Sequence, residues 1–304
     1  MNKWLWSGFV GAVVLGLAAF SINSLQLGNP PANKPYEQQW KLAAGTMKQL
    51  YIQSDYEIAV QFAQSTDGDD HVIIEGAVTP GIGQQLKSTI LQTDTLALHL
   101  DRQQHSWQLV KPRVQPHVQY ITIQLADLHS LQLADFRLGS AQTNLNHIQA
   151  AHIRVQSGSG RIKAQQLQGN VQLITSNGDI SVATWAGTKL DMQTGSGQIQ
   201  IGKASGTIHT ATGSGELHIQ QLRGNADINS HSGDVQLALA GSHNVNVQVE
   251  TAAVNIVTEP TFAGSYKADS QFGHVLMPKQ SLTGPYQIHT YSESGSIAIR
   301  QTEL

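Results

Sequence analysis

The sequence predicts an all-β protein built around a parallel β-solenoid, in which coils of about 18 residues stack on one another. Three observations lead to this prediction. Charged residues make up only 13% of the chain, which contains 28 glycines, and this composition is typical of turn-rich β structure. Apolar and polar residues alternate over short segments, which indicates strands. One glycine-containing phrase recurs at a nearly constant spacing, which indicates stacked repeats.

The chain begins with an apolar stretch, residues 4–22, that directly follows Lys3. As a helix this stretch spans roughly 28 Å, close to the ~30 Å hydrocarbon core of a bilayer. The preceding positive charge favours a cytoplasmic N-terminus with the rest of the chain exported. We therefore expect residues 1–24 to form a membrane anchor. A signal peptide cleaved near residues 19–21 is the alternative, and both interpretations place the folded part in the periplasm or outside the cell.

A tether and a β-rich region are expected next. Residues 25–35 contain three prolines, which stop a helix and favour a short, stiff linker. Residues 36–138 then form a region of predicted strands that would cap the first coil. Alternation of apolar residues marks six segments in it: 50–52, 58–62, 72–74, 96–100, 107–110 and 120–125. Asp67-Gly68 predicts a β-hairpin between the second and third of these, because glycine readily takes the positive φ of a tight turn.

The repeat that defines the predicted solenoid occupies residues 139–304. Its phrase combines Ser, Gly, an acidic or polar residue and an aliphatic residue. The key turn glycines recur in steps of 18 or 19 residues: Gly160, Gly178, Gly197, Gly215 and Gly233. A second glycine series marks a further turn in each coil: Gly169, Gly187, Gly206, Gly224 and Gly241. The predicted inward column consists of aliphatic residues: Ile162, Ile180, Ile199, Leu217 and Val235. One coil cannot bury this column, whereas coils stacked at ~4.8 Å can.

An antiparallel sandwich is the alternative fold, because its turns have a similar spacing of roughly 8–12 residues. A sandwich does not require the same residue type at the same phase of five successive units, so we favour the solenoid. Degenerate phrases at residues 273–275 and 294–297 would extend the repeat to the C-terminus. Five aromatic residues near the C-terminus would then close the last coil: Phe262, Tyr266, Phe272, Tyr286 and Tyr291.

These residues carry a resemblance to a known family. The repeated Ser-Gly-Asp/Glu-Ile/Val phrase, together with the upstream segment 48–55, resembles the bacterial family of domains of unknown function described as putative adhesins. LiaG-like envelope proteins belong to this family, and the resemblance covers roughly residues 45–300. It implies a right-handed β-solenoid behind an N-terminal membrane segment, and a loose link to envelope stress systems. It implies no catalytic residues.

Signals for catalysis and cofactor binding are weak. The Gly-Ser-Gly phrases lack the third glycine of a dinucleotide fingerprint and the Gly-Lys-Ser/Thr of a phosphate loop, so they are interpreted as structural turns. The chain contains no cysteine, no His-Glu-x-x-His and no Gly-x-Ser-x-Gly. We therefore expect no catalytic residue and no cofactor. With no basic run and a net charge of −3, we also expect no nucleic-acid partner.

Two polar columns remain as candidate sites. The residues after the key glycines include Asp179, Glu216 and Asp234, which could line an acidic edge that attracts a cation; a solvent-facing polar edge is the alternative. A column of hydroxyl residues is predicted to cap backbone groups at the turns: Ser157, Thr175, Thr194, Thr212 and Ser230. A weakly charged face carrying such Ser, Thr, Gln and Asn ladders could also hold carbohydrate.

The function expected from the sequence is therefore a non-enzymatic scaffold or adhesin-like binding protein of the cell envelope. Its expected partner is an envelope polysaccharide or another envelope protein, with membrane contact through residues 4–22. The alternative is a β-helix carbohydrate-active enzyme, of the polysaccharide lyase or hydrolase type, that uses the acidic edge.

Overall fold

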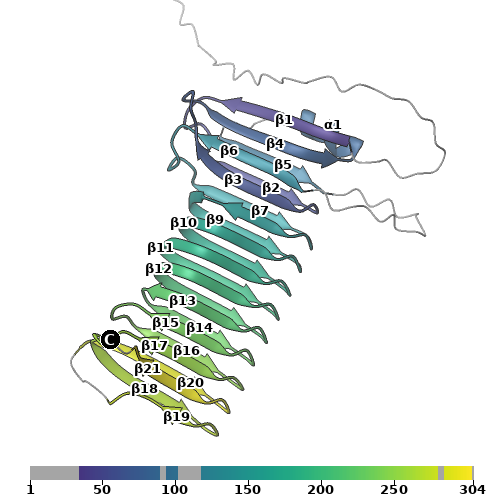
Figure 1. Ribbon diagram of the computed structural model, residues 1–304. Helices are drawn as coiled ribbons and strands as arrows, with labels where there is room; N and C mark the ends of the chain where they lie inside the picture. Colours follow the sequence, from purple (N-terminus) through teal and green to yellow (C-terminus); the bar gives the residue numbers. More distant parts are fainter. Residues whose placement is uncertain (1–33, 90–93, 102–117, 280–283, 303–304) are drawn as a thin grey trace, which may run out of the picture.

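The computed structural model describes residues 34–89, 94–101, 118–279 and 284–302. These residues form an all-β molecule in which one sheet of 21 strands is wound into a long stack (Figure 1). The described strands are β1 (Lys34–Leu42), β2 (Gln49–Ser54), β3 (Ile58–Gln64), β4 (Asp70–Val78), β5 (Thr95–Leu100), β6 (Gln119–Leu125), β7 (Leu133–Leu138), β8 (Thr143–Asn146), β9 (Ile148–Ser157), β10 (Ile162–Thr175), β11 (Ile180–Thr194), β12 (Ile199–Thr212), β13 (Leu217–Arg223), β14 (Ala226–Ser230), β15 (Val235–Leu239), β16 (Val245–Val249), β17 (Val254–Thr258), β18 (Gly264–Ser270), β19 (Val275–Leu276), β20 (Tyr286–Ser292) and β21 (Ile297–Gln301). One helix, α1 (Pro80–Lys87), lies beside β1 and β5.

Successive coils pair in parallel and in register, as the repeat predicts. Ile180 lies opposite Ile199, and Ile199 lies opposite Leu217 in the next coil. These aliphatic side chains are buried, and the column they form continues in both directions through one hydrophobic core. The predicted stacking of like-phase aliphatic residues is therefore confirmed.

The second glycine series only partly forms the predicted turns. Gly224 and Gly241 lie between separate strands, as the sequence predicts. The first three members, Gly169, Gly187 and Gly206, produce bends instead. Strands β10, β11 and β12 run unbroken through these glycines, with only a shift of register beside them. Gly169 has a φ of 121°, in the region that favours glycine, and a Cβ there would lie 1.9 Å from the carbonyl oxygen of Ala150 in the neighbouring coil. Such a bend redirects the strand without ending its pairing, which explains why the turn is absent.

The predicted hairpin at Asp67-Gly68 is wrong. Gly68 does take a positive φ of 82°, but β3 and β4 are not neighbours. Strand β6 lies between them, parallel to β3 and antiparallel to β4. The turn at Gly68 therefore forms as its sequence indicates. The strand that lies between β3 and β4, however, comes from a distant segment, Gln119–Leu125. The outermost strand at this end is β1, which pairs antiparallel with β4.

On the other face at this end, the order of the strands in space also differs from their order in the sequence. Strand β2 lies between β5 and β7, and all three run parallel. Strand β7 then pairs with β9, and β8 with β10, so parallel pairing continues across Gly139. The stack that begins with the N-terminal strands is therefore continuous with the repeat. The predicted domain limits at 36–138 and 139–304 remain a prediction.

The C-terminal end shows the same kind of exchange. Strand β20 lies between β16 and β18, and β21 lies between β17 and β19. The outermost coil is thus formed by β18 and β19. The strands that follow them in sequence, β20 and β21, lie between this coil and the coil of β16 and β17. The predicted aromatic closure holds for Phe262 and Tyr266, which are buried and stacked with ring centroids 5.1 Å apart. It is wrong for Phe272 and Tyr291, which are exposed.

Several predictions concern segments outside the described residues. The apolar stretch 4–22 and most of the linker 25–35 fall there, as does the expected strand 107–110. Within the described ranges, no helix combines the length and the hydrophobicity needed to cross a membrane.

Candidate binding groove

The turns at the key glycines share one hydrogen-bond pattern. In each of the five predicted turns, the hydroxyl of the Ser or Thr three residues earlier accepts a hydrogen bond from the glycine N–H; the distance is 3.0 Å for Gly160, Gly178, Gly197, Gly215 and Gly233. Some of these hydroxyls also donate to the preceding coil, as Thr194 does to the carbonyl oxygen of Gly178 at 3.0 Å. The predicted hydroxyl column therefore caps the turns and helps to join the coils.

Close approach of neighbouring coils explains why these turns require glycine. A Cβ on Gly197 would lie 2.0 Å from the carbonyl oxygen of Gly178, and one on Gly215 would lie 1.7 Å from that of Gly197. No side chain fits at such a separation. The key glycines are thus structural residues of the turn.

The acidic edge is present, and each of its carboxylates is engaged in hydrogen bonds or an ion pair. Asp179 pairs with Arg161, with its Oδ2 2.9 Å from Nη2, and its Oδ1 accepts from the N–H of Gln198. Glu216 accepts from Nε2 of Gln198 at 3.3 Å, and Asp234 accepts from the N–H of Ala253 at 2.9 Å. Across the described ranges, no group of three or more His, Asp or Glu side chains is arranged to hold a metal ion.

A groove of about 600 Å³ runs along the face formed by the second halves of the coils. It crosses strands β10, β11, β12, β14, β16 and β20, which pair successively in parallel. Its floor is a single outward column in which each residue pairs with the next: Ile174, Gln193, Ala211, Asn229, Gln248 and Tyr291. One rim is the adjacent row of capped turns.

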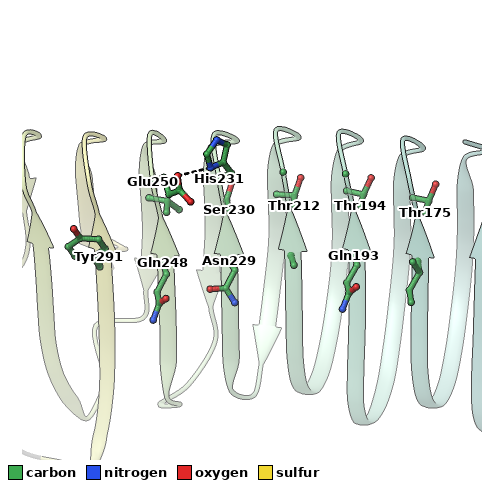
Figure 2. Close-up of a pocket in the computed structure, with 15 residues that line it drawn as sticks. Thr175, Gln193, Thr194, Thr212, Asn229, Ser230, His231, Gln248, Glu250 and Tyr291 are labelled. Carbon is green, nitrogen blue, oxygen red and sulfur yellow. Dashed lines mark ion pairs between the residues drawn. The ribbon is translucent and has the colours of Figure 1, made fainter. Parts of the chain in front are cut away.

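The groove floor combines amides with apolar surface (Figure 2). Gln193, Asn229 and Gln248 are exposed and stand in one row, and Tyr291 is 42% exposed at the end of that row. Each side-chain amide offers both donors and an acceptor. A tyrosine ring offers a flat apolar face with a polar tip. The floor can therefore contact a ligand that carries both hydroxyl groups and apolar faces.

Charge in the groove is confined to one pair at its rim. Nδ1 of His231 lies 2.7 Å from Oε2 of Glu250, and both side chains are mostly exposed (Figure 2). The adjacent hydroxyl of Ser230 is buried and donates to the carbonyl oxygen of Gly233 at 2.6 Å. It is therefore engaged in its turn and does not serve the histidine as a nucleophile.

A second polar cluster lies at the N-terminal end of the stack, away from the groove. Asp67 accepts from His71 Nε2 at 2.8 Å and from Lys41 Nζ at 3.0 Å. These two hydrogen bonds hold the pKa of the Asp67 carboxyl well below its ordinary value of 3.8, and the bond from His71 has the larger effect. Ser65 and the N–H of Asp69 also donate to this carboxylate, so the cluster stabilises the turn between β3 and β4.

The groove was only partly visible in the sequence. The predicted carbohydrate-compatible face is this one, but its floor residues were not singled out, and Tyr291 was assigned to the cap. A usable signal exists, because residues 174, 193, 211 and 229 each directly precede a member of the hydroxyl column. The place of Tyr291 beside Gln248 depends on the insertion of β20 next to β16, which no periodicity reveals.

Comparison with known proteins places this geometry in a structural group. A putative adhesin from Parabacteroides distasonis is 12% identical, with 90% of this chain and 98% of that chain covered and a TM-score of 0.50. A putative adhesin from Bacteroides fragilis is 16% identical, with 90% and 100% covered and a TM-score of 0.42. At 12% identity, the likeness to the Parabacteroides distasonis structure shows the fold alone. No curated protein matches the sequence.

The family assignment follows from a match over most of the chain. The Toastrack family, DUF4097, matches residues 47–300, which include all the key glycines and the strands from β2 to β21 except the last residue of β21. This confirms the resemblance inferred from the repeated phrase. The chain belongs to the Toastrack DUF4097 family.

Proposed function

We propose that this chain is a non-enzymatic scaffold of the bacterial cell envelope that binds an extended, weakly charged glycan along its groove. The observation that supports this proposal is the row of Gln193, Asn229 and Gln248 with Tyr291 at its end. A sugar carries hydroxyl groups around its ring and apolar C–H surface on its faces. Amides satisfy the hydroxyl groups, and an aromatic ring packs against the faces.

The repeat favours a polymeric ligand over a small one. Equivalent positions on neighbouring strands recur at ~4.8 Å, so the five steps from β10 to β20 extend over roughly 24 Å. A chain molecule laid along this line meets an amide at three of the six floor positions and the tyrosine ring at the last. Each contact is weak, but linked contacts strengthen one another because later ones form at high effective concentration.

A binding role agrees better with the groove chemistry than a catalytic one. A general base must reach the proton it removes, and the hydroxyl beside His231 is occupied within its turn. The acidic edge of the alternative enzyme is also spread over neighbouring coils, with Asp179 neutralised by Arg161. The groove therefore offers recognition groups without an assembled reaction centre.

The envelope location rests on two supports. Residues 4–22 are predicted to anchor or export the chain. The structural relative from Parabacteroides distasonis is described as a putative adhesin. An exported rod with a lateral groove would present its binding face along its length.

A binding screen with matched variants tests the proposal. Purified chain is titrated with a panel of envelope polysaccharides and envelope proteins, and the Kd of the best ligand is measured. Asn229→Ala combined with Tyr291→Ala should weaken glycan binding about tenfold or more, because it removes a hydrogen-bonding group and the ring. The control is Gln236→Ala combined with Asn255→Ala, which removes paired outward amides from the opposite face.

Unchanged Kd in the groove variant, or an equal loss in the control, would contradict the groove as the binding site. Exclusive binding of a protein ligand would contradict the glycan and leave the scaffold role.

A further inference from the structure

The C-terminal end of the stack presents an open edge. Strand β18 pairs only with β20, and β19 only with β21, among the described strands. Val275 continues the inward aliphatic column and lies opposite the buried Ile297, yet it is 39% exposed. Leu276 and Met277 beside it are exposed as well. No described residue therefore covers the apolar core at this end, in the half of the coil that Phe262 and Tyr266 do not close.

The outermost turn also departs from the repeat. Gly273 donates to the hydroxyl of Ser270 at 2.9 Å, as in the other turns. The position two residues after that hydroxyl is polar in the other turns of this type: Ser159, Asn177, Ser196, Ser214, Ser232 and Ser294. In the outermost turn it is Phe272, which is 74% exposed. An aromatic side chain thus replaces a polar one at the terminal coil, next to the uncovered core.

The opposite end of the stack is built differently. There β1 and β4 run antiparallel to the strands they cover, β1 begins Lys34-Pro35, and α1 lies against β1 and β5. Proline and lysine on an edge strand oppose further pairing. These strands end the half of the coil that carries β19. The half that carries β18 ends at β5, which runs parallel to β2 and lies against α1. The charge pattern of β18 is complementary to that of a second β18.

The charges on β18 favour such a pairing. Lys267 and Asp269 are exposed, two residues apart, and so lie on the same outward face. In a two-fold antiparallel pairing centred on Ala268, each Lys267 lies opposite Asp269 of the second copy. Opposite charges directly across two strands stabilise their pairing. The same arrangement brings the uncovered core ends of both copies together and places each Phe272 level with Gly264 of the second copy.

We propose that two copies of this chain join tail to tail through β18, which extends the sheet across a two-fold axis and buries the C-terminal core end. The partner is a second copy because the edge is self-complementary in charge and in apolar surface. The proposal does not depend on ligand binding, although the groove ends at Tyr291 on β20, directly beside Asp269 of β18.

Cysteine cross-linking of the full-length chain tests the pairing and its register. The chain contains no cysteine, so every disulfide reports an introduced pair. Residues opposite each other in an antiparallel pair have Cα atoms ~4.5–5.5 Å apart, within disulfide reach. Differently tagged Lys267→Cys and Asp269→Cys chains, mixed and oxidised, should give a disulfide-linked heterodimer, and either alone should give several-fold less. Asp227→Cys mixed with Asn229→Cys, on the interior strand β14, is the matched control.

Charge reversal gives an independent measurement. Lys267→Asp should weaken dimerisation roughly tenfold or more by sedimentation, because it places two acidic side chains opposite each other. Lys267→Asp combined with Asp269→Lys should restore it, since the charges are exchanged but remain complementary. A chain that stays monomeric at all concentrations, or cross-links no better at β18 than at β14, would overturn the proposal. A dimerisation Kd that is unchanged in Lys267→Asp would also overturn it.

Discussion

Each key glycine lies so close to a carbonyl oxygen of the preceding coil that a residue with a side chain does not fit in the turn. Gly197 is such a position, because its substituent would lie 2.0 Å from Gly178 O. Gly197→Ala should destabilise the chain by about 2–3 kcal/mol, since neighbouring coils must move apart. Gly83→Ala is the control, because its Cβ would meet nothing nearer than 3.6 Å and alanine favours a helix by about 1 kcal/mol.

Urea unfolding of both variants measures this difference. Equal stability of Gly197→Ala and the unmodified chain would contradict the close approach of the coils.

The Asp67 cluster predicts a pH dependence of stability. The pKa of Asp67 is lowered on folding by His71 and Lys41, so its contribution is fully present above the unfolded pKa near 4 and is lost as pH falls through the folded pKa. Asp67→Asn should therefore destabilise the chain at pH 5 and have less effect near pH 2. Thermal unfolding at both values tests this, with the exposed Glu37→Gln as control. A loss of stability that is the same at pH 5 and pH 2 would count against the lowered pKa of Asp67.

At the scale of elements, the repeat predicted the interior coils and could not predict the ends. Inside the stack, like residues meet because one coil is the neighbour of the next, so Ile180 and Ile199 pair as their phase requires. At the ends, the neighbours are distant in sequence. Strand β6 separates β3 from β4, and β20 separates β16 from β18, and neither exchange leaves a periodic signal.

Nearest-neighbour stacking predicts that one interior coil can be removed. Deleting residues 198–215 joins Gly197 to Glu216 and brings Ile180 opposite Leu217, so that both the hydroxyl column and the aliphatic column stay in phase. This variant should fold with unchanged strand content per residue by circular dichroism. Deleting only 198–206 shifts the phase by half a coil and should abolish cooperative unfolding. Similar unfolding of the two variants would contradict the in-register stack.

At the scale of the whole molecule, the stack presents two surfaces that meet at β20 and β18. The groove lies along the side of the rod, and the open edge lies at its C-terminal end, far from β1 (Figure 1). A tail-to-tail pair would double the length of the rod and place its two N-terminal ends furthest apart. The lateral grooves would remain available along both halves.

Hydrogen–deuterium exchange of the full chain, with and without the tightest glycan from the screen, tests the central claim most directly. If the glycan lies in the groove, added protection should appear in β11, β12, β14, β16 and β20, and the opposite face at β13, β15 and β17 should be unchanged. Protection centred on the opposite face, or no protection at saturating glycan, would contradict the assignment of this groove as the binding surface.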